Sequence, residues 1–113
     1  MTIAAAVGAR VLVVDDDPAA RRLLEVRLRG MGCEVATAAD GQAALAALEQ
    51  GLPAVILLDL EMPRLDGMAL LRKLRGEGVD VPVIVVTAHG SIEAAVAAVK
   101  EGAENFLPKP FDP

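Results

Sequence analysis

The sequence is poor in the side chains on which several binding and scaffold functions depend. Aromatic residues make up only 2% of it, two Phe with no Trp or Tyr. Aliphatic side chains and alanine must therefore fill the core, and a surface that stacks nucleic-acid bases is excluded. The single cysteine, Cys33, cannot form a disulfide within the chain. Together with the single histidine, His89, it is too little for a structural zinc site.

Long apolar segments and an excess of positive charge are also missing. The longest stretch without Asp, Glu, Lys or Arg covers residues 81–92, whereas a membrane-spanning helix needs about 18 consecutive apolar residues. The first residues lack the basic segment of a signal peptide. Eleven Lys and Arg against sixteen Asp and Glu give a net charge of −5, which argues against direct nucleic-acid binding. These absences predict a cytoplasmic domain that binds neither a membrane nor nucleic acid.

The residues that are present predict one α/β domain. The chain has 113 residues, of which 54% are hydrophobic, enough for a single core. Short apolar runs rich in β-branched residues alternate with helical patterns, which predicts a parallel sheet with right-handed crossovers. Expected strands cover residues 11–14, 34–38, 54–58, 81–86 and 105–107, and expected helices cover 18–29, 42–50, 68–75 and 92–101. Residues 1–9 are expected to form a loose tail and 10–113 the folded domain.

The first expected helix has the clearest local signals. Asp17 suits an N-cap, and Pro18 follows at the first helical position. Its apolar stripe is expected to contain Ala20, Leu23, Leu24, Leu28 and Met31. Arg21 and Arg22 lie outside that stripe, and we interpret them as part of a solvated basic face. Cys33, beyond the helix, is expected to be buried and inert.

Polar residues follow four of the five expected strands. The acidic run 15–17 follows the first strand and Asp59 the third, while Thr87 and Lys109 follow the fourth and fifth. Because ligands bind at the carboxyl ends of parallel strands, we expect these side chains to meet at one edge. For Asp17 alone, the N-cap role is the better interpretation.

The composition of this edge predicts a phosphate-acceptor site. Clustered carboxylates repel one another unless a cation joins them, and oxygen ligands suit Mg²⁺. A carboxylate such as Asp59 beside the ion can act as a nucleophile towards phosphorus. The ammonium of Lys109 and the hydroxyl of Thr87 could neutralise the transferred oxygens.

Four stretches of the chain, residues 13–17, 58–67, 86–88 and 106–111, resemble a receiver (response regulator) domain of bacterial two-component signalling. They stand in the family's order and spacing within residues 10–112. The segment of residues 88–112 resembles in particular the receivers of nitrogen-regulatory-type activators. The resemblance implies a flavodoxin-like three-layer αβα sandwich, whose five-stranded parallel sheet has the order 2-1-3-4-5.

The resemblance also implies roles for individual residues at the metal site. Asp59 matches the phosphoacceptor. Asp16 matches the acidic residue that binds Mg²⁺ directly, and Asp15 its neighbour, which often acts through water. Glu61 matches the position whose backbone carbonyl completes the metal site.

Further roles concern the response to phosphorylation. Thr87 matches the switch hydroxyl, and Phe106 matches an aromatic switch that turns inward on phosphorylation. Lys109 matches the lysine that pairs with the acceptor and then with the phosphate, and the bond from Lys109 to Pro110 matches one that is usually cis. His89, which we interpret as solvated, could alternatively tune the loss of the phosphoryl group.

The function implied by the resemblance is a phosphoacceptor signalling switch. A histidine kinase phosphohistidine donates the phosphoryl group to Asp59, and the new charge controls an output or partner. The domain would catalyse its own phosphorylation and slow hydrolysis without turning over a metabolite. Implied partners are the kinase, which the first helix helps to contact, a C-terminal output domain in a longer protein, and a second copy in a homodimer.

Two other functions stay open on the sequence alone. A haloacid-dehalogenase-type phosphatase also uses an Asp nucleophile after a strand. Asp15 and Asp17 fit the start of its motif, but Ala19 replaces the expected Thr or Val, and no cap domain fits in this length. A pseudo-receiver that serves only as a binding module is the other alternative. No glycine-rich loop indicates a nucleotide cofactor.

Receivers usually carry a fifth helix after the Lys-Pro motif, and this sequence stops at Pro113, where that helix would begin. We expect part of one sheet face to lack cover within the chain, and exposed apolar patches often mark interfaces. The chain could be a piece of a longer regulator, which we prefer, a dimer through the bare face, or a naturally short receiver.

Overall fold

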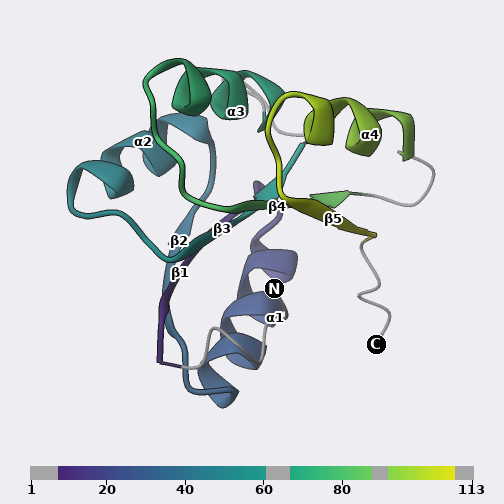
Figure 1. The fold of residues 1–113 in the computed structure, drawn as a ribbon. Helices are drawn as coiled ribbons and strands as arrows, with labels where there is room; N and C mark the ends of the chain where they lie inside the picture. Colours follow the sequence, from purple (N-terminus) through teal and green to yellow (C-terminus); the bar gives the residue numbers. More distant parts are fainter. Residues whose placement is uncertain (1–7, 61–66, 88–91, 109–113) are drawn as a thin grey trace.

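A computed structural model describes residues 8–60, 67–87 and 92–108, which form a five-stranded parallel sheet and four helices (Figure 1). The strands are β1 Arg10–Val14, β2 Glu34–Ala38, β3 Val55–Asp59, β4 Val83–Thr87 and β5 Asn105–Pro108. The helices are α1 Pro18–Gly30, α2 Gly41–Glu49, α3 Gly67–Gly76 and α4 Ile92–Lys100. The strand order β2-β1-β3-β4-β5 confirms the expected flavodoxin-like arrangement.

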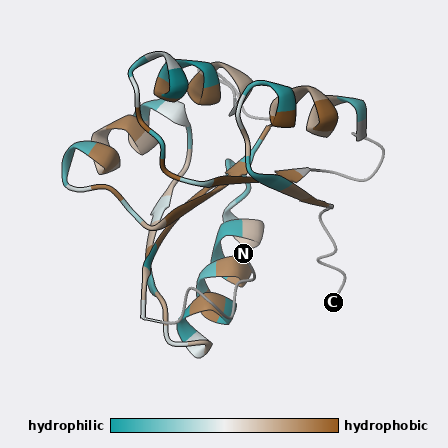
Figure 2. Cartoon of the chain, viewed as in Figure 1, coloured by the Kyte–Doolittle hydropathy of each residue, from teal (hydrophilic) through white to brown (hydrophobic). Residues whose placement is uncertain are grey.

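The helices cover the two faces of the sheet unequally. In Figure 1, α1 lies on one side, and α2, α3 and α4 lie on the other. Side chains alternate between the faces along each strand, so Leu12 and Ile56 join the core under α2, α3 and α4. Val11 and Leu57 belong to the second cluster, with Leu28 of α1. Figure 2 shows the central strands as the most continuously hydrophobic part of the molecule, which is the pattern of a sheet buried on both faces.

The start of α1 is as expected, but one end of its predicted stripe is not. The Asp17 side chain accepts a hydrogen bond from Ala19 N at 3.0 Å, which confirms the N-cap, and Pro18 opens the helix. Met31, expected on the buried stripe, is 38% exposed. The helix ends at Gly30 and Met31 is the C-cap residue, so its side chain no longer follows the helical face.

The start of the fourth strand differs from its prediction. The expected fourth strand included Val81 and Pro82, which was wrong, because β4 begins at Val83. Pro82 has no N–H for the ladder, although its carbonyl oxygen accepts a hydrogen bond from Ile56 N at 2.9 Å. β2 is an edge strand and is the less buried for it, since only Ala38 at its end is fully buried. Cys33, just before it, is buried as expected.

The described residues before β1, Gly8 and Ala9, form hydrogen bonds with the segment at the start of β2. Gly8 N donates to the carbonyl oxygen of Gly32, and Glu34 N donates to that of Ala9, both at 3.0 Å. Residues 1–7 of the expected tail lie outside the described part of the chain. Among the helices that are described, none has the length and apolar character to span a bilayer.

The side chain of Arg75 in α3 connects the turn after α4 with the segment between α3 and β4. Arg75 Nε and Nη2 both donate to the carbonyl oxygen of Gly102, at 3.1 and 2.9 Å. Its Nη1 donates to Val79 O at 2.7 Å and its Nη2 to Val81 O at 3.0 Å. The turn after α4 is thereby joined to the segment that leads from α3 into β4.

Candidate functional site

Three carboxylates meet at the carboxyl edge of the sheet. Asp15 and Asp16 directly follow β1, and Asp59 is the last residue of the adjacent strand β3. One oxygen from each of the three can be chosen so that all lie within 4.8 Å of one another. Asp15 and Asp59 are only 1% and 3% exposed, while Asp16 is exposed. The cluster is therefore open to solvent on the side of Asp16.

Hydrogen bonds hold the backbone around Asp15, directly after β1, in place. Asp15 N donates to the Ala38 carbonyl oxygen of β2 at 3.1 Å, so the sheet ladder extends one residue past β1. Asp17 N then donates to Asp15 Oδ1 at 2.9 Å, which turns the chain towards α1. From that helix, Arg21 Nη1 donates to the Asp15 carbonyl oxygen at 2.8 Å.

A glycine shapes the site on the β3 side. Gly67, the first residue of α3, is buried, and its N–H donates to the Leu60 carbonyl oxygen at 3.4 Å. A Cβ at this position would lie 2.7 Å from Leu60 Cα and would also collide with the carbonyl oxygen of Asp59. Only glycine lets α3 start this close to the backbone of Asp59.

The donor set of this cluster fits a divalent cation. Three unit charges about 5 Å apart repel by roughly 3 kcal/mol per pair at the effective dielectric constant of a partly buried site. All the ligand atoms are carboxylate oxygens, which Mg²⁺ and Ca²⁺ prefer over softer ligands. Because two of the three carboxylates are buried, bulk water and salt screen their repulsion less than at a surface.

Other residues expected at the site are only partly described. The backbone of Thr87 ends β4 beside β3, where Asp59 pairs in register with Val86. Phe106 in β5 pairs with Val85, is half-buried and packs against the core under α2, α3 and α4. Glu61, Lys109 and its bond to Pro110, and His89 lie outside the described residues, so their roles stay predictions.

Two residues that contact the site were not singled out as site residues from the sequence. Gly67 was given no role of its own from the sequence. The signal for it is a glycine directly before the expected start of a helix at residue 68. Arg21 was assigned to the solvated basic face. Its contact with Asp15 O reaches back six residues, for which the sequence carries no spacing signal.

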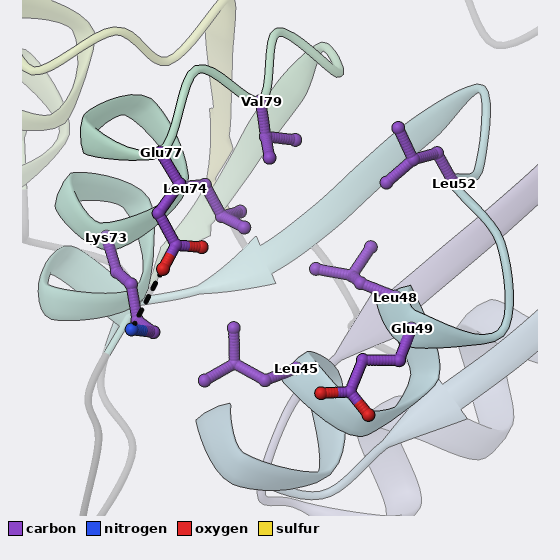
Figure 3. A pocket seen from close by; sticks show the side chains of 8 residues that line it. All are labelled: Leu45, Leu48, Glu49, Leu52, Lys73, Leu74, Glu77 and Val79. Atoms are coloured by element: carbon purple, nitrogen blue, oxygen red, sulfur yellow. Dashed lines mark ion pairs between the residues drawn. The ribbon is translucent and has the colours of Figure 1, made fainter.

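A separate apolar pocket lies between α2 and α3 (Figure 3). It has a volume of about 360 Å³ and is lined by Leu45, Leu48, Glu49, Leu52, Lys73, Leu74, Glu77 and Val79. Figure 3 shows the ion pair between Lys73 and Glu77 at its rim, with an N–O distance of 3.1 Å. None of the three clustered carboxylates lines it, so the acidic edge remains the candidate site.

A doubly wound parallel sheet with charged groups at its carboxyl edge defines a class of α/β domains that bind ligands at that edge. Within that class, the chain belongs to the response regulator receiver domain family, whose profile matches residues 11–113. This confirms the resemblance seen in the four sequence stretches, and it identifies the chain as a signalling domain of two-component systems.

Individual relatives include regulators of the nitrogen-regulatory type. The chain is 46% identical over 102 residues to the DNA-binding transcriptional regulator NtrC of Salmonella typhimurium, covering 90% of this chain and 22% of the relative. It is equally identical to the response regulator MprA of Mycobacterium tuberculosis, covering 90% of this chain and 44% of the relative. The chain thus spans less than half of these curated relatives.

Solved structures agree with the fold described above. The receiver domain of NtrX from Brucella abortus superposes with a TM-score of 0.85 at 40% identity, over 90% of this chain and 87% of that one. The chemotaxis protein CheY4 of Vibrio cholerae superposes with a TM-score of 0.83 at 34% identity, over 92% and 88%.

Proposed function

We propose that this domain is a phosphoacceptor switch in which Asp59 receives a phosphoryl group from the phosphohistidine of a histidine kinase. The observation that carries the proposal is the convergence of Asp15, Asp16 and Asp59 at one edge of the sheet, in a chain of the receiver family. An Asp59 oxygen attacks phosphorus, the O–P bond forms as the N–P bond breaks, and the histidine nitrogen that leaves takes up a proton.

We propose that Mg²⁺ is held by Asp15, Asp16 and Asp59, with the backbone carbonyl of Glu61 as a further ligand. When bound, the ion neutralises carboxylate charge and the developing charge on the phosphoryl oxygens. Thr87 and Lys109 would donate hydrogen bonds to those oxygens. The burial of Asp59 would limit the access of water to the acyl phosphate.

The response to phosphorylation is proposed to spread along the α4–β5 side. A phosphoryl group adds negative charge and new acceptor oxygens at Asp59, which Thr87, at the end of β4, would approach. Phe106 is half-buried and would turn further inward. Since the chain spans 22% of NtrC and 44% of MprA, the surface so altered would act on an output domain or a separate partner.

The proposal is tested with acetyl phosphate, whose acetate leaves as Asp59 is phosphorylated. Intact-mass spectrometry is expected to detect one acid-labile phosphoryl adduct in the presence of Mg²⁺ and none in EDTA. Asp59→Asn should abolish the adduct, whereas the matched control Asp80→Asn, which changes an exposed carboxylate elsewhere, should retain it. The absence of any adduct on the wild-type chain would refute the proposed function.

A further inference from the structure

The guanidinium of Arg21 contacts the backbone that carries two of the three clustered carboxylates. Its Nη1 donates to the carbonyl oxygen of Asp15 at 2.8 Å, and the side chain is half-buried. Arg22, the next residue, is exposed, and its side chain makes no hydrogen bond or ion pair with the described residues. The two neighbouring arginines thus have different surroundings, and of the two only Arg21 contacts the loop of residues 15–17 after β1.

The position of Arg21 near the start of α1 is not one that the helix dipole favours for a cation. The helix begins at Pro18 and has no acidic side chain in its first turn. A cation near a helix N-terminus opposes the helix dipole. The hydrogen bond to Asp15 O therefore gives this side chain a favourable interaction that its own helix does not supply.

We propose that Arg21 is a positioning residue, which holds the loop after β1 so that Asp15 and Asp16 direct their oxygens towards Asp59. This inference rests on the proposed Mg²⁺ site. Other bonds among the described residues also hold this loop, among them those from Asp15 N to Ala38 O and from Asp17 N to Asp15 Oδ1. These two bonds engage the amide groups and the Asp15 side chain, whereas the guanidinium of Arg21 engages the Asp15 carbonyl oxygen.

Charge and positioning predict opposite effects, which makes the inference testable. If Arg21 were only a nearby positive charge, its removal would make the cluster more negative and would strengthen Mg²⁺ binding. If Arg21 orders the loop, its removal weakens binding, as the loss of groups that orient metal ligands typically does, by about 10-fold or more.

The test compares the wild type with Arg21→Met, which removes the charge and the donors but keeps an extended side chain, and with the matched control Arg22→Met. Isothermal titration calorimetry measures the Kd for Mg²⁺, and hydrogen exchange follows the Asp17 amide that bonds to Asp15 Oδ1. Arg21→Met is expected to bind Mg²⁺ about 10-fold more weakly and to exchange faster at Asp17. Arg22→Met is expected to match the wild type or to bind slightly more tightly.

Arg21→Lys keeps the charge and serves as the second variant if Arg21→Met does not fold. An ammonium lacks the planar, multi-donor geometry of a guanidinium. The Mg²⁺ affinity of Arg21→Lys should therefore fall below that of the wild type. Affinity and exchange equal to the wild type in the folded Arg21 variants, or tighter Mg²⁺ binding, would overturn the inference. A wild-type chain that binds no Mg²⁺ would instead refute the proposed metal site itself.

Discussion

Replacing Gly67 by alanine is expected to disturb the candidate site and the stability of the fold together. The added Cβ would lie 2.7 Å from Leu60 Cα and would also meet the Asp59 carbonyl oxygen. Carbon atoms pack best about 3.5–4.0 Å apart, so the end of β3 and the start of α3 must separate by roughly 1 Å. Overpacking of this kind destabilises proteins by about 1–3 kcal/mol.

The same substitution at the other end of α3 provides the control. A Cβ on Gly76 would meet nothing within 4 Å, so Gly76→Ala should stabilise the fold by about 0.4–1 kcal/mol through the unfolded state. Urea unfolding of both variants measures the difference. A Gly67→Ala protein as stable as the wild type would refute the reasoning from close approach. We also expect it to be phosphorylated more slowly, because a misplacement of about 1 Å can reduce rates by about 10²-fold.

Three further predictions concern charge, capping and the corner after α4. Without Mg²⁺, Asp59→Asn should be more stable to urea than the wild type by about 1–3 kcal/mol, since it removes the repulsion with buried Asp15, while solvent weakens the repulsion with exposed Asp16; equal or lower stability would contradict the repulsion. Asp40 accepts from Ala43 N at 2.8 Å as the N-cap of α2, so Asp40→Ala should lower the free energy of unfolding by about 1 kcal/mol and Asp40→Asn by less. Arg75→Met removes the donor from the carbonyl oxygens of Gly102, Val79 and Val81. It should lower the free energy of unfolding by about 2–3 kcal/mol in the same assay. A decrease of less than about 0.5 kcal/mol, as for ordinary surface substitutions, would contradict a structural role of these bonds.

Much of the fold followed from local patterns. Apolar β-branched runs such as residues 11–14 and 55–58 predicted buried strands, because a parallel sheet is covered on both faces. The N-cap at Asp17 was predictable because its interaction is local, reaching Ala19 N two residues on. Met31 was misassigned because the apolar spacing was continued past residue 29, where the expected helix already ended.

The site was predictable where it depended on strand ends and unpredictable where it depended on tertiary contact. Asp15 and Asp59 follow apolar runs, so topology alone brought them to one edge. The contact of Gly67 with Asp59 depends on the distance between a strand end and the next helix. The bond of Arg21 to the Asp15 carbonyl depends on how α1 packs on the sheet. Neither distance is encoded in a short sequence pattern.

The central claim, that Asp59 is the phosphoacceptor, is tested most directly by locating the phosphoryl group. After incubation with acetyl phosphate and Mg²⁺, borohydride reduces an aspartyl phosphate to homoserine, which peptide mass spectrometry assigns to a position. We predict homoserine at position 59 alone, and none when Mg²⁺ is withheld. Homoserine at position 15 or 16 would contradict the account and would favour a phosphatase-like nucleophile after β1.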